Sequence, residues 1–140
     1  QLLNRSWIIL FLRPAGDLCG QRRSFARDNA PGVWDSSAAG HVDSGENCRD
    51  AAIRELHEEL AISHYSEFEF IGKLSASARS GYEFVYVYRA LSEQRARRDP
   101  LEVMDGRWCS ELELRHWLRD SSAAFTLTFR DILGTYRPFE

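Results

Sequence analysis

The sequence predicts an α/β layered domain, and three observations favour this class. The chain has 140 residues, a length that suits one domain, so residues 1–140 are expected to form a single unit. Hydrophobic residues make up 44% and aromatic residues 12% of the chain, which is enough for a substantial core. Segments with strand patterns are mixed with three segments with helix patterns. Such a mixture is typical of helices layered on a sheet.

The first half of the chain predicts a hairpin and a short strand. The apolar run at residues 7–12 predicts a buried strand, residues 14–17 a turn, and residues 18–23 a returning strand. Residues 28–32 are rich in turn formers and predict a loop, which leads into a short strand at 34–38 and then into a second loop before the first helix.

The second half predicts a long strand pair at 68–78 and 82–89. The second of these strands is apolar on both faces, which is expected of a central strand. A further short strand is predicted at 107–109. Ser110 and Glu113 form a capping-box pattern that starts a helix. A last helix is predicted at about 128–136.

The remaining helix is predicted to start at Asn47, a good N-cap, with Asp50 in its first turn. It should end at Ala61 in a left-handed conformation, where alanine in place of glycine costs about 1 kcal/mol.

Charge and cysteine content narrow the class of protein. A net charge of −3 gives no general attraction to long nucleic acid or to an anionic membrane surface. The three cysteines have no metal-binding spacing, which favours a reduced, cytoplasmic protein. The apolar run at 7–12 is too short to span a bilayer. Because the chain opens at Gln1, we expect preceding residues to be missing.

An acidic motif is the strongest chemical signal in the chain. Gly40 and Glu46 precede a predicted helical segment, and at about 100° per residue Glu55, Glu58 and Glu59 of that segment lie within one arc. Like charges at this spacing oppose a helix by roughly 0.2–0.5 kcal/mol per pair, so a bound cation would remove a penalty. A hard divalent ion such as Mg²⁺ suits oxygen ligands. An ordinary surface helix with ion pairs is the alternative, and the preceding glycine and glutamate argue against it.

Residues 40–62 resemble the Nudix box. That pattern is Gly, five residues, Glu, seven residues, Arg-Glu, an aliphatic residue, any residue, Glu-Glu, any residue, Gly and an aliphatic residue; only its last glycine differs here, as Ala61. The resemblance implies a Nudix-type α/β/α sandwich around a mixed β-sheet. Weaker similarities to the branch that contains isopentenyl-diphosphate isomerase occur at residues 21–24, 31–35, 102–103 and 107–108.

The resemblance also implies a reaction. Nudix enzymes generally hydrolyse a nucleoside diphosphate linked to another moiety, and Mg²⁺ (or Mn²⁺) is the expected cofactor because it can neutralise phosphate oxygens and activate water. By motif position, Glu55 and Glu59 would be the principal metal ligands, and Glu58 an additional ligand or the base. The backbone at Gly40 would be another metal contact.

Two further positions of the motif have supporting roles. Arg54 would orient the neighbouring metal ligand Glu55, and Glu46 would support the preceding loop. The partner is expected to be a small-molecule diphosphate whose identity the fold does not supply. The oligomeric state is left open, although many members of the family form homodimers.

Candidates outside the box complete the predicted site. Glu83 and Glu102 are alternatives for a further catalytic carboxylate, and the sequence does not decide between them. Arg22 and Arg23 suit bidentate binding of a diphosphate, but neighbours on a strand face opposite sides, so only one is expected to reach the site. Trp34 is a candidate platform for a nucleobase.

Tyr82 is a second candidate platform, although large aromatic side chains more often belong to the core. His41 lies next to the motif glycine and is a candidate metal contact, although a lone histidine is usually structural.

Two other functions compete with hydrolysis. In isopentenyl-diphosphate isomerase the residue before the motif glycine is the catalytic cysteine, and histidines upstream help to build its metal site. Here Ala39 takes the cysteine position and no histidine precedes His41, so the isomerase is the weaker alternative. A non-catalytic ligand-binding module is the third, and the retained carboxylates argue against it.

Overall fold

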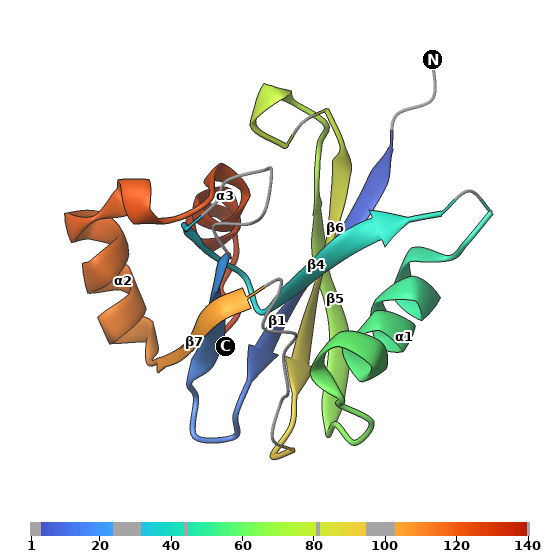
Figure 1. Ribbon diagram of the computed structural model, residues 1–140, viewed down its shortest axis with the longest axis horizontal. Helices are drawn as coiled ribbons and strands as arrows, with labels where there is room; N and C mark the ends of the chain where they lie inside the picture. Colours follow the sequence, from blue (N-terminus) through green and yellow to red (C-terminus); the bar gives the residue numbers. More distant parts are fainter. Residues whose placement is uncertain (1–3, 24–31, 44, 81, 95–102, 140) are drawn as a thin grey trace.

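The computed structural model describes residues 4–23, 32–43, 45–80, 82–94 and 103–139, excluding the side chains of Arg23 and of residues 103–105. These ranges contain one mixed sheet and three α-helices (Figure 1). The strands are β1 (Arg5–Leu12), β2 (Leu18–Arg23), β3 (Trp34–Asp35), β4 (Ala38–Val42), β5 (Glu67–Leu74), β6 (Phe84–Leu91) and β7 (Val103–Cys109). The helices are α1 (Cys48–Leu60), α2 (Glu111–Asp120) and α3 (Leu127–Thr135), with 3-10 turns η1 (Ala78–Ser80) and η2 (Ser122–Ala124).

Strand β1 holds the two parts of the sheet together. It runs parallel to β6 along its whole length and antiparallel to β4 along its first half. It meets β2 only at its end, where Leu12 pairs with Leu18. One group of strands therefore has the order β4-β1-β6-β5. The second group consists of β2 with β3 and β7 as its partners, and it joins the first through the end of β1.

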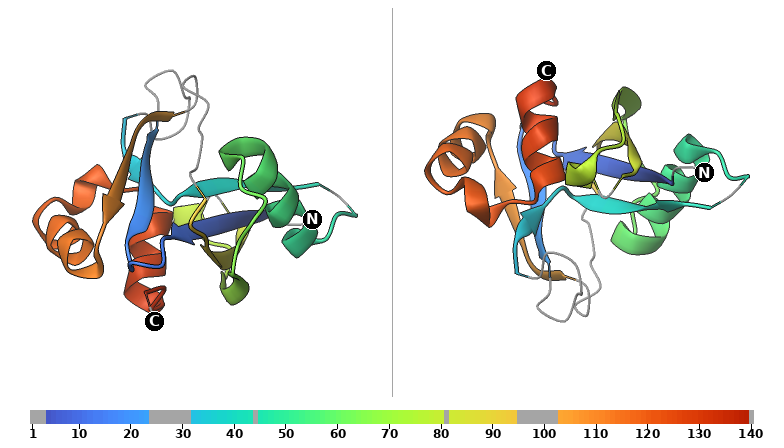
Figure 2. Two further views of the ribbon diagram at one scale, coloured as in Figure 1. Left: turned by 90° about the horizontal axis from the view of Figure 1, so that it is seen from below. Right: turned by 90° about the horizontal axis from the view of Figure 1, so that it is seen from above.

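The helices lie on both sides of this sheet. Helix α1 packs on one side, and α2 and α3 lie on the other (Figures 1 and 2). Alternate residues of β1 point to opposite faces, so its continuous apolar run supplies both cores. The predicted α/β/α sandwich around a mixed sheet is confirmed.

The two cores are separate clusters. The α1-side cluster consists of Trp7, Ile9, Phe11, Cys19, Ala38, Ala51, Ala52, Leu56, Leu60, Ile62, Tyr88 and Ala90. The α2/α3-side cluster consists of Ile8, Leu10, Leu12, Leu18, Val85, Val87, Cys109, Leu114, Phe125, Phe129, Ile132 and Leu133.

The helix ends follow the sequence closely. The Asn47 side chain accepts hydrogen bonds from the backbone N–H groups of Arg49 and Asp50 and so caps α1. Ala61 ends α1 in the left-handed region with φ of 58°. The predicted capping box of Ser110 and Glu113 is present at the start of α2.

One strand prediction was wrong. Residues 34–38 do not form one strand; β3 ends at Asp35 and β4 begins at Ala38, so most of β4 occupies residues expected to form a loop. Side chains replace the strand ladder at the break. Asp35 accepts a hydrogen bond from the Ser36 N–H, and Ser37 Oγ accepts one from the Phe11 N–H at 2.8 Å.

Other boundaries shifted less. Strand β5 ends at Leu74, before the predicted residue 78, and the connection to β6 contains η1. Strand β7 begins at Val103, earlier than predicted. Of the loop predicted at 28–32, residues 28–31 lie outside the described residues. In the described part of the chain, no helix has both the length and the apolar character needed to cross a membrane.

Candidate functional site

The acidic motif forms one side of α1. The helix buries Ala52 and Leu56 against the sheet, whereas the side chain of Glu58 is exposed. Glu55 and Glu59 are half-buried at the edge of the buried stripe. Their positions follow from helical geometry, because residues three and four apart share a face. The three carboxylates therefore line one edge of the interface between α1 and the sheet.

Arg54 is the centre of an ion-pair cluster on this edge. Its guanidinium lies 2.8 Å from Glu46 Oε2, 2.8 Å from Glu55 Oε1 and 3.2 Å from Glu58 Oε2. The hydrogen bond from Arg54 lowers the pKa of Glu46 below its usual value. One guanidinium carries a single positive charge, against three negative charges from the carboxylates of Glu46, Glu55 and Glu58. The cluster therefore keeps an excess of negative charge that favours a cation.

The loop before α1 is held in place by Arg5, which the sequence did not single out. Arg5 donates to the backbone carbonyls of Asp43 and Glu46, at 3.4 Å and 3.0 Å, and to Cys48 Sγ at 3.5 Å. Gly45 has φ of 80°, a conformation that glycine adopts readily. An arginine at the open end of a buried strand is the signal that would have identified this brace.

Glu46 supports the same loop from within. Its Oε1 accepts a hydrogen bond from the Asp43 N–H at 3.3 Å while its Oε2 meets Arg54. The loop and the acidic edge are thus joined through one carboxylate.

Gly40 lies beneath an indole ring on the α1 side of β4. It pairs with Trp7 of β1, and a Cβ at this position would lie 2.6 Å from Trp7 Cζ2. Only glycine leaves room for the ring in this arrangement. The motif glycine therefore has a packing role in this chain, whatever its backbone binds.

The donor set fits a hard divalent cation. Glu55, Glu58 and Glu59 offer only carboxylate oxygens, which are the ligands that Mg²⁺ and Mn²⁺ prefer. Among the described residues, no three His, Cys, Asp or Glu side chains converge on a single point. Glu55 and Glu58 point instead to Arg54, so binding a cation would require these carboxylates to turn from the guanidinium.

Glu83 lies away from the acidic edge. Its Oε1 is 3.2 Å from Nδ1 of His41. His41 follows Gly40 on β4, and by strand alternation it shares a face with Ala39, which packs on the α2/α3-side cluster. The structure therefore brings Glu83 together with His41 on the sheet face opposite α1.

Arg22 and Trp34 also lie on the α2/α3 side. Arg22 pairs with Trp34 across β2 and β3, and its Nε donates to the Gly32 carbonyl at 2.9 Å. The Trp34 ring packs edge-on against Trp117, with ring centroids 5.1 Å apart. The side chain of Arg23 and the whole of Glu102 lie outside the described residues.

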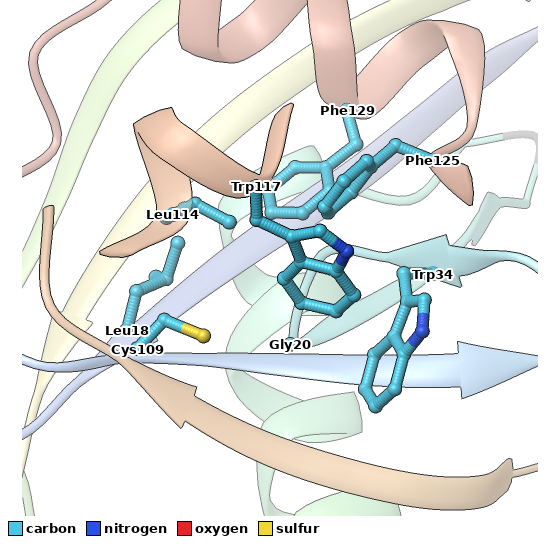
Figure 3. A pocket seen from close by; sticks show the side chains of 8 residues that line it. All are labelled: Leu18, Gly20, Trp34, Cys109, Leu114, Trp117, Phe125 and Phe129. Atoms are coloured by element: carbon cyan, nitrogen blue, oxygen red, sulfur yellow. The ribbon is translucent and has the colours of Figure 1, made fainter. Parts of the chain in front are cut away.

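An apolar pocket lies beneath α2, next to Trp34 (Figure 3). It is lined by Leu18, Gly20, Trp34, Cys109, Leu114, Trp117, Phe125 and Phe129. Burial raises the pKa of the Cys109 thiol, which makes it a poor nucleophile at neutral pH. The lining residues have the character of core packing.

Two known proteins are similar in sequence to this chain. An uncharacterized Nudix hydrolase of Pseudomonas aeruginosa is 48% identical over 61 residues, which cover 44% of this chain and 36% of that protein. An isopentenyl-diphosphate Delta-isomerase of Streptomyces griseus is 29% identical over 141 residues, which cover 97% of this chain and 71% of that protein.

A solved structure supports the fold. The crystal structure of a Deinococcus radiodurans protein matches with a TM-score of 0.79 at 24% identity, covering 96% of this chain and 83% of that one. The NUDIX domain family matches residues 2–129. The chain therefore belongs to the Nudix family.

Proposed function

We propose that this chain is a divalent-cation-dependent pyrophosphohydrolase that cleaves a nucleoside diphosphate linked to another moiety, or a similar organic diphosphate. Membership of the Nudix family and similarity to a Nudix hydrolase indicate a hydrolase that acts on pyrophosphate bonds. We infer in addition that it needs a divalent cation and that its substrate is of this class. The single observation that carries it is the cluster of Glu46, Glu55 and Glu58 around Arg54, where the preceding loop meets the edge of α1.

The residues of the cluster have distinct proposed roles. Glu55 and Glu59 would hold Mg²⁺ or Mn²⁺, with the Gly40 backbone as a further contact. When bound, such a cation supplies charge neutralisation of the phosphate oxygens and a water of lowered pKa. Arg54 orients Glu55, to which it donates at 2.8 Å. Glu46 fixes Arg54 from the other side.

Glu58 is the catalytic base that the described contacts favour. It shares the edge of α1 with the proposed metal ligands, whereas Glu83 faces His41 across the sheet. A base must come within hydrogen-bond reach of the attacking water. Glu102 is retained as the alternative base, and Arg23 as the proposed contact to the diphosphate.

The partner and location follow from composition. We infer a small-molecule substrate and not long nucleic acid, because the chain carries a net charge of −3. Three free, buried cysteines support a reducing, cytoplasmic environment.

An isoprenoid diphosphate isomerase is the second candidate. It is favoured by the similarity to the Streptomyces griseus isomerase along nearly the whole chain. Against it, Ala39 occupies the position of the catalytic cysteine and packs on the α2/α3-side cluster. A methyl group has no proton to donate to an alkene, so hydrolysis is the better proposal.

The test is turnover against a panel of nucleoside triphosphates, dinucleotides, sugar nucleotides and isoprenoid diphosphates, with and without Mg²⁺. Phosphate release and isomer formation are both measured. Glu59→Gln, which removes a charge at nearly constant volume, should abolish Mg²⁺-dependent hydrolysis while leaving the unfolding midpoint unchanged.

The matched control is Glu69→Gln on β5, an exposed glutamate outside the motif whose ion-pair partner is Arg89. It should retain full turnover. Isomer formation without hydrolysis would favour the isomerase. A folded protein that binds Mg²⁺ and turns over nothing in the panel would favour a non-catalytic ligand-binding module.

A further inference from the structure

We propose that the indole N–H of Trp7 belongs to the active site and donates to an anionic oxygen that lies over Gly40 when the site is loaded. This inference rests on the proposed function, because it adds a positioning residue to the same site. It assigns to a buried tryptophan a role that its place in an apolar strand does not suggest.

The first observation is an unsatisfied donor. Trp7 is fully buried, and its Nε1 has no hydrogen-bond acceptor among the described residues. Buried donors are rarely left unpaired, because they lose their hydrogen bonds to water without replacement. One nitrogen of Arg13 and one of Arg115 are also buried without a hydrogen-bond partner among the described residues. Each of these guanidinium groups, however, donates a hydrogen bond through another of its nitrogens. The indole side chain of Trp7 has no second N–H.

The second observation is the place of this donor. Trp7 Nε1 lies 3.0 Å from the position that a Cβ on Gly40 would occupy. The N–H edge of the ring is therefore over the motif glycine, on the α1 side of β4. Ala52 and Leu56 of α1 belong to the same cluster as Trp7.

The acidic edge of α1 adjoins these contacts. Glu55 is three residues from Ala52, and Glu59 is three residues from Leu56, so each shares a helix face with a residue of the Trp7 cluster. The unpaired N–H thus lies in the layer between β4 and the proposed metal ligands.

The chemistry of the acceptor follows from this position. Indole is a donor only, and a hydrogen bond from it to an ionised oxygen is stronger than one to a neutral group. Two sources can bring such an oxygen over Gly40. One is a carboxylate of α1 that turns when a cation binds; the other is an oxygen of the bound diphosphate.

Nitrogen–proton NMR of the tryptophan side chains distinguishes these sources. The chain has four tryptophans, and Trp7→Phe assigns the Trp7 indole signal by its disappearance. Mg²⁺ is added alone, and then with methylenediphosphonate, which cannot be hydrolysed. A downfield shift of the Trp7 indole proton with Mg²⁺ alone identifies a carboxylate acceptor. A shift that needs both identifies an oxygen of the ligand.

Kinetics provide the second readout. Trp7→Phe keeps a ring but loses the N–H, and it should lower kcat roughly ten- to a hundredfold, as for a lost hydrogen bond to a charged group. KM should change less. Trp117→Phe, which removes an indole N–H from the α2/α3 side, should leave kcat unchanged.

Two results would overturn the inference while leaving the proposed function intact. In one, the wild-type protein hydrolyses its substrate and the α1 signals shift on loading, but the Trp7 indole signal stays in place. In the other, Trp7→Phe lowers only the unfolding midpoint and retains kcat. Absence of both turnover and any α1 shift would instead refute the proposed function, and the inference with it.

Discussion

Two glycines on opposite faces of the sheet each make room for an aromatic ring, and the rings differ in what surrounds them. Gly40 on β4 lies beneath Trp7, and Gly72 on β5 lies beneath Tyr136. Trp7 is fully buried, and its indole N–H has no acceptor in the described part of the chain. Tyr136 directly follows α3 and packs on the α2/α3-side cluster. The same packing arrangement therefore accommodates a buried indole on the α1 side and, on the other side, a tyrosine ring that packs on the α2/α3-side cluster.

The two faces of the sheet also differ in the side chains that surround these rings. On the α1 side, the apolar cluster borders the ion pairs of Arg54 and a loop braced by Arg5. On the α2/α3 side, aromatic rings pack edge-on against one another; the centroids of Trp117 and Phe125, for example, are 4.6 Å apart. What distinguishes the α1 side, which we propose to be the functional one, is a cluster in which carboxylates outnumber the guanidinium they surround. Apolar packing alone does not identify it.

Truncating one buried residue on each face should give the largest effects. Leu56→Ala and Ile132→Ala each remove a fully buried side chain and should lower the free energy of unfolding by about 2–5 kcal/mol. Urea denaturation measures both. At a temperature where both variants are folded, only Leu56→Ala should reduce turnover, because Leu56 adjoins Glu55 on α1. Equal losses of turnover would mean that the two faces are not functionally distinct.

Adding a methyl group to each glycine should have the next largest effect. Gly40→Ala and Gly72→Ala push a Cβ into the Trp7 and Tyr136 rings, and overpacking of this kind costs about 1–3 kcal/mol. Thermal unfolding without metal measures the loss. Calorimetric titration with Mg²⁺ should show weakened binding for Gly40→Ala alone. Unchanged Mg²⁺ affinity in Gly40→Ala would separate Gly40 from the proposed metal site.

Local sequence signals predicted much of the fold. The apolar run of β1, the turn before β2 and the caps at Asn47 and Ser110 each depend on neighbouring residues, and the structure contains them where the sequence indicated. The break between β3 and β4 was missed because it depends on distant partners. The Ser37 hydroxyl bonds the backbone of Phe11, and Asp35 bonds Thr126 across 91 positions.

The candidate site was predictable only in part for the same reason. Helical spacing gathered Glu55, Glu58 and Glu59 on one edge, because that spacing is a local property. The faces of Arg22 and Glu83 depended on strand register, which the sequence did not supply. Arg5 was missed because its partners lie about forty positions away, on the loop before α1.

Relieving backbone strain at two connecting positions should have a smaller, stabilising effect. Ala61, at the end of α1, and Tyr82, before β6, have φ of 58° and 61°. Replacing either with glycine should raise the free energy of unfolding by up to about 1 kcal/mol, because glycine adopts this region without strain. Chemical denaturation tests this. Turnover should persist in Ala61→Gly, which leaves every carboxylate of α1 in place; a lost turnover would show that the alanine itself sets the site geometry.

The smallest effects concern two glutamates whose pKa values are lowered for different reasons. The Arg54 hydrogen bond lowers the pKa of Glu46 on the α1 side, and the Ser110 backbone N–H lowers that of Glu113 in the α2 capping box, each from an ordinary value near 4.5. A depressed folded-state pKa adds stability above the unfolded value, and this is lost as pH falls through the folded-state pKa. Both contributions should therefore disappear on acidification below about pH 4.5.

Arg54→Gln separates the two causes. Carboxyl-carbon NMR titration should show the Glu46 pKa returning towards its ordinary value in this variant, while that of Glu113 stays lowered, because a backbone donor is unaffected by the substitution. The salt dependence should differ as well, since screening weakens an exposed ion pair more than a capping hydrogen bond. If both values moved together, the two faces would be electrostatically coupled through the sheet. If neither moved, the guanidinium would not be the group that holds Glu46 ionised, and the ion-pair cluster on α1 would lose its organising residue.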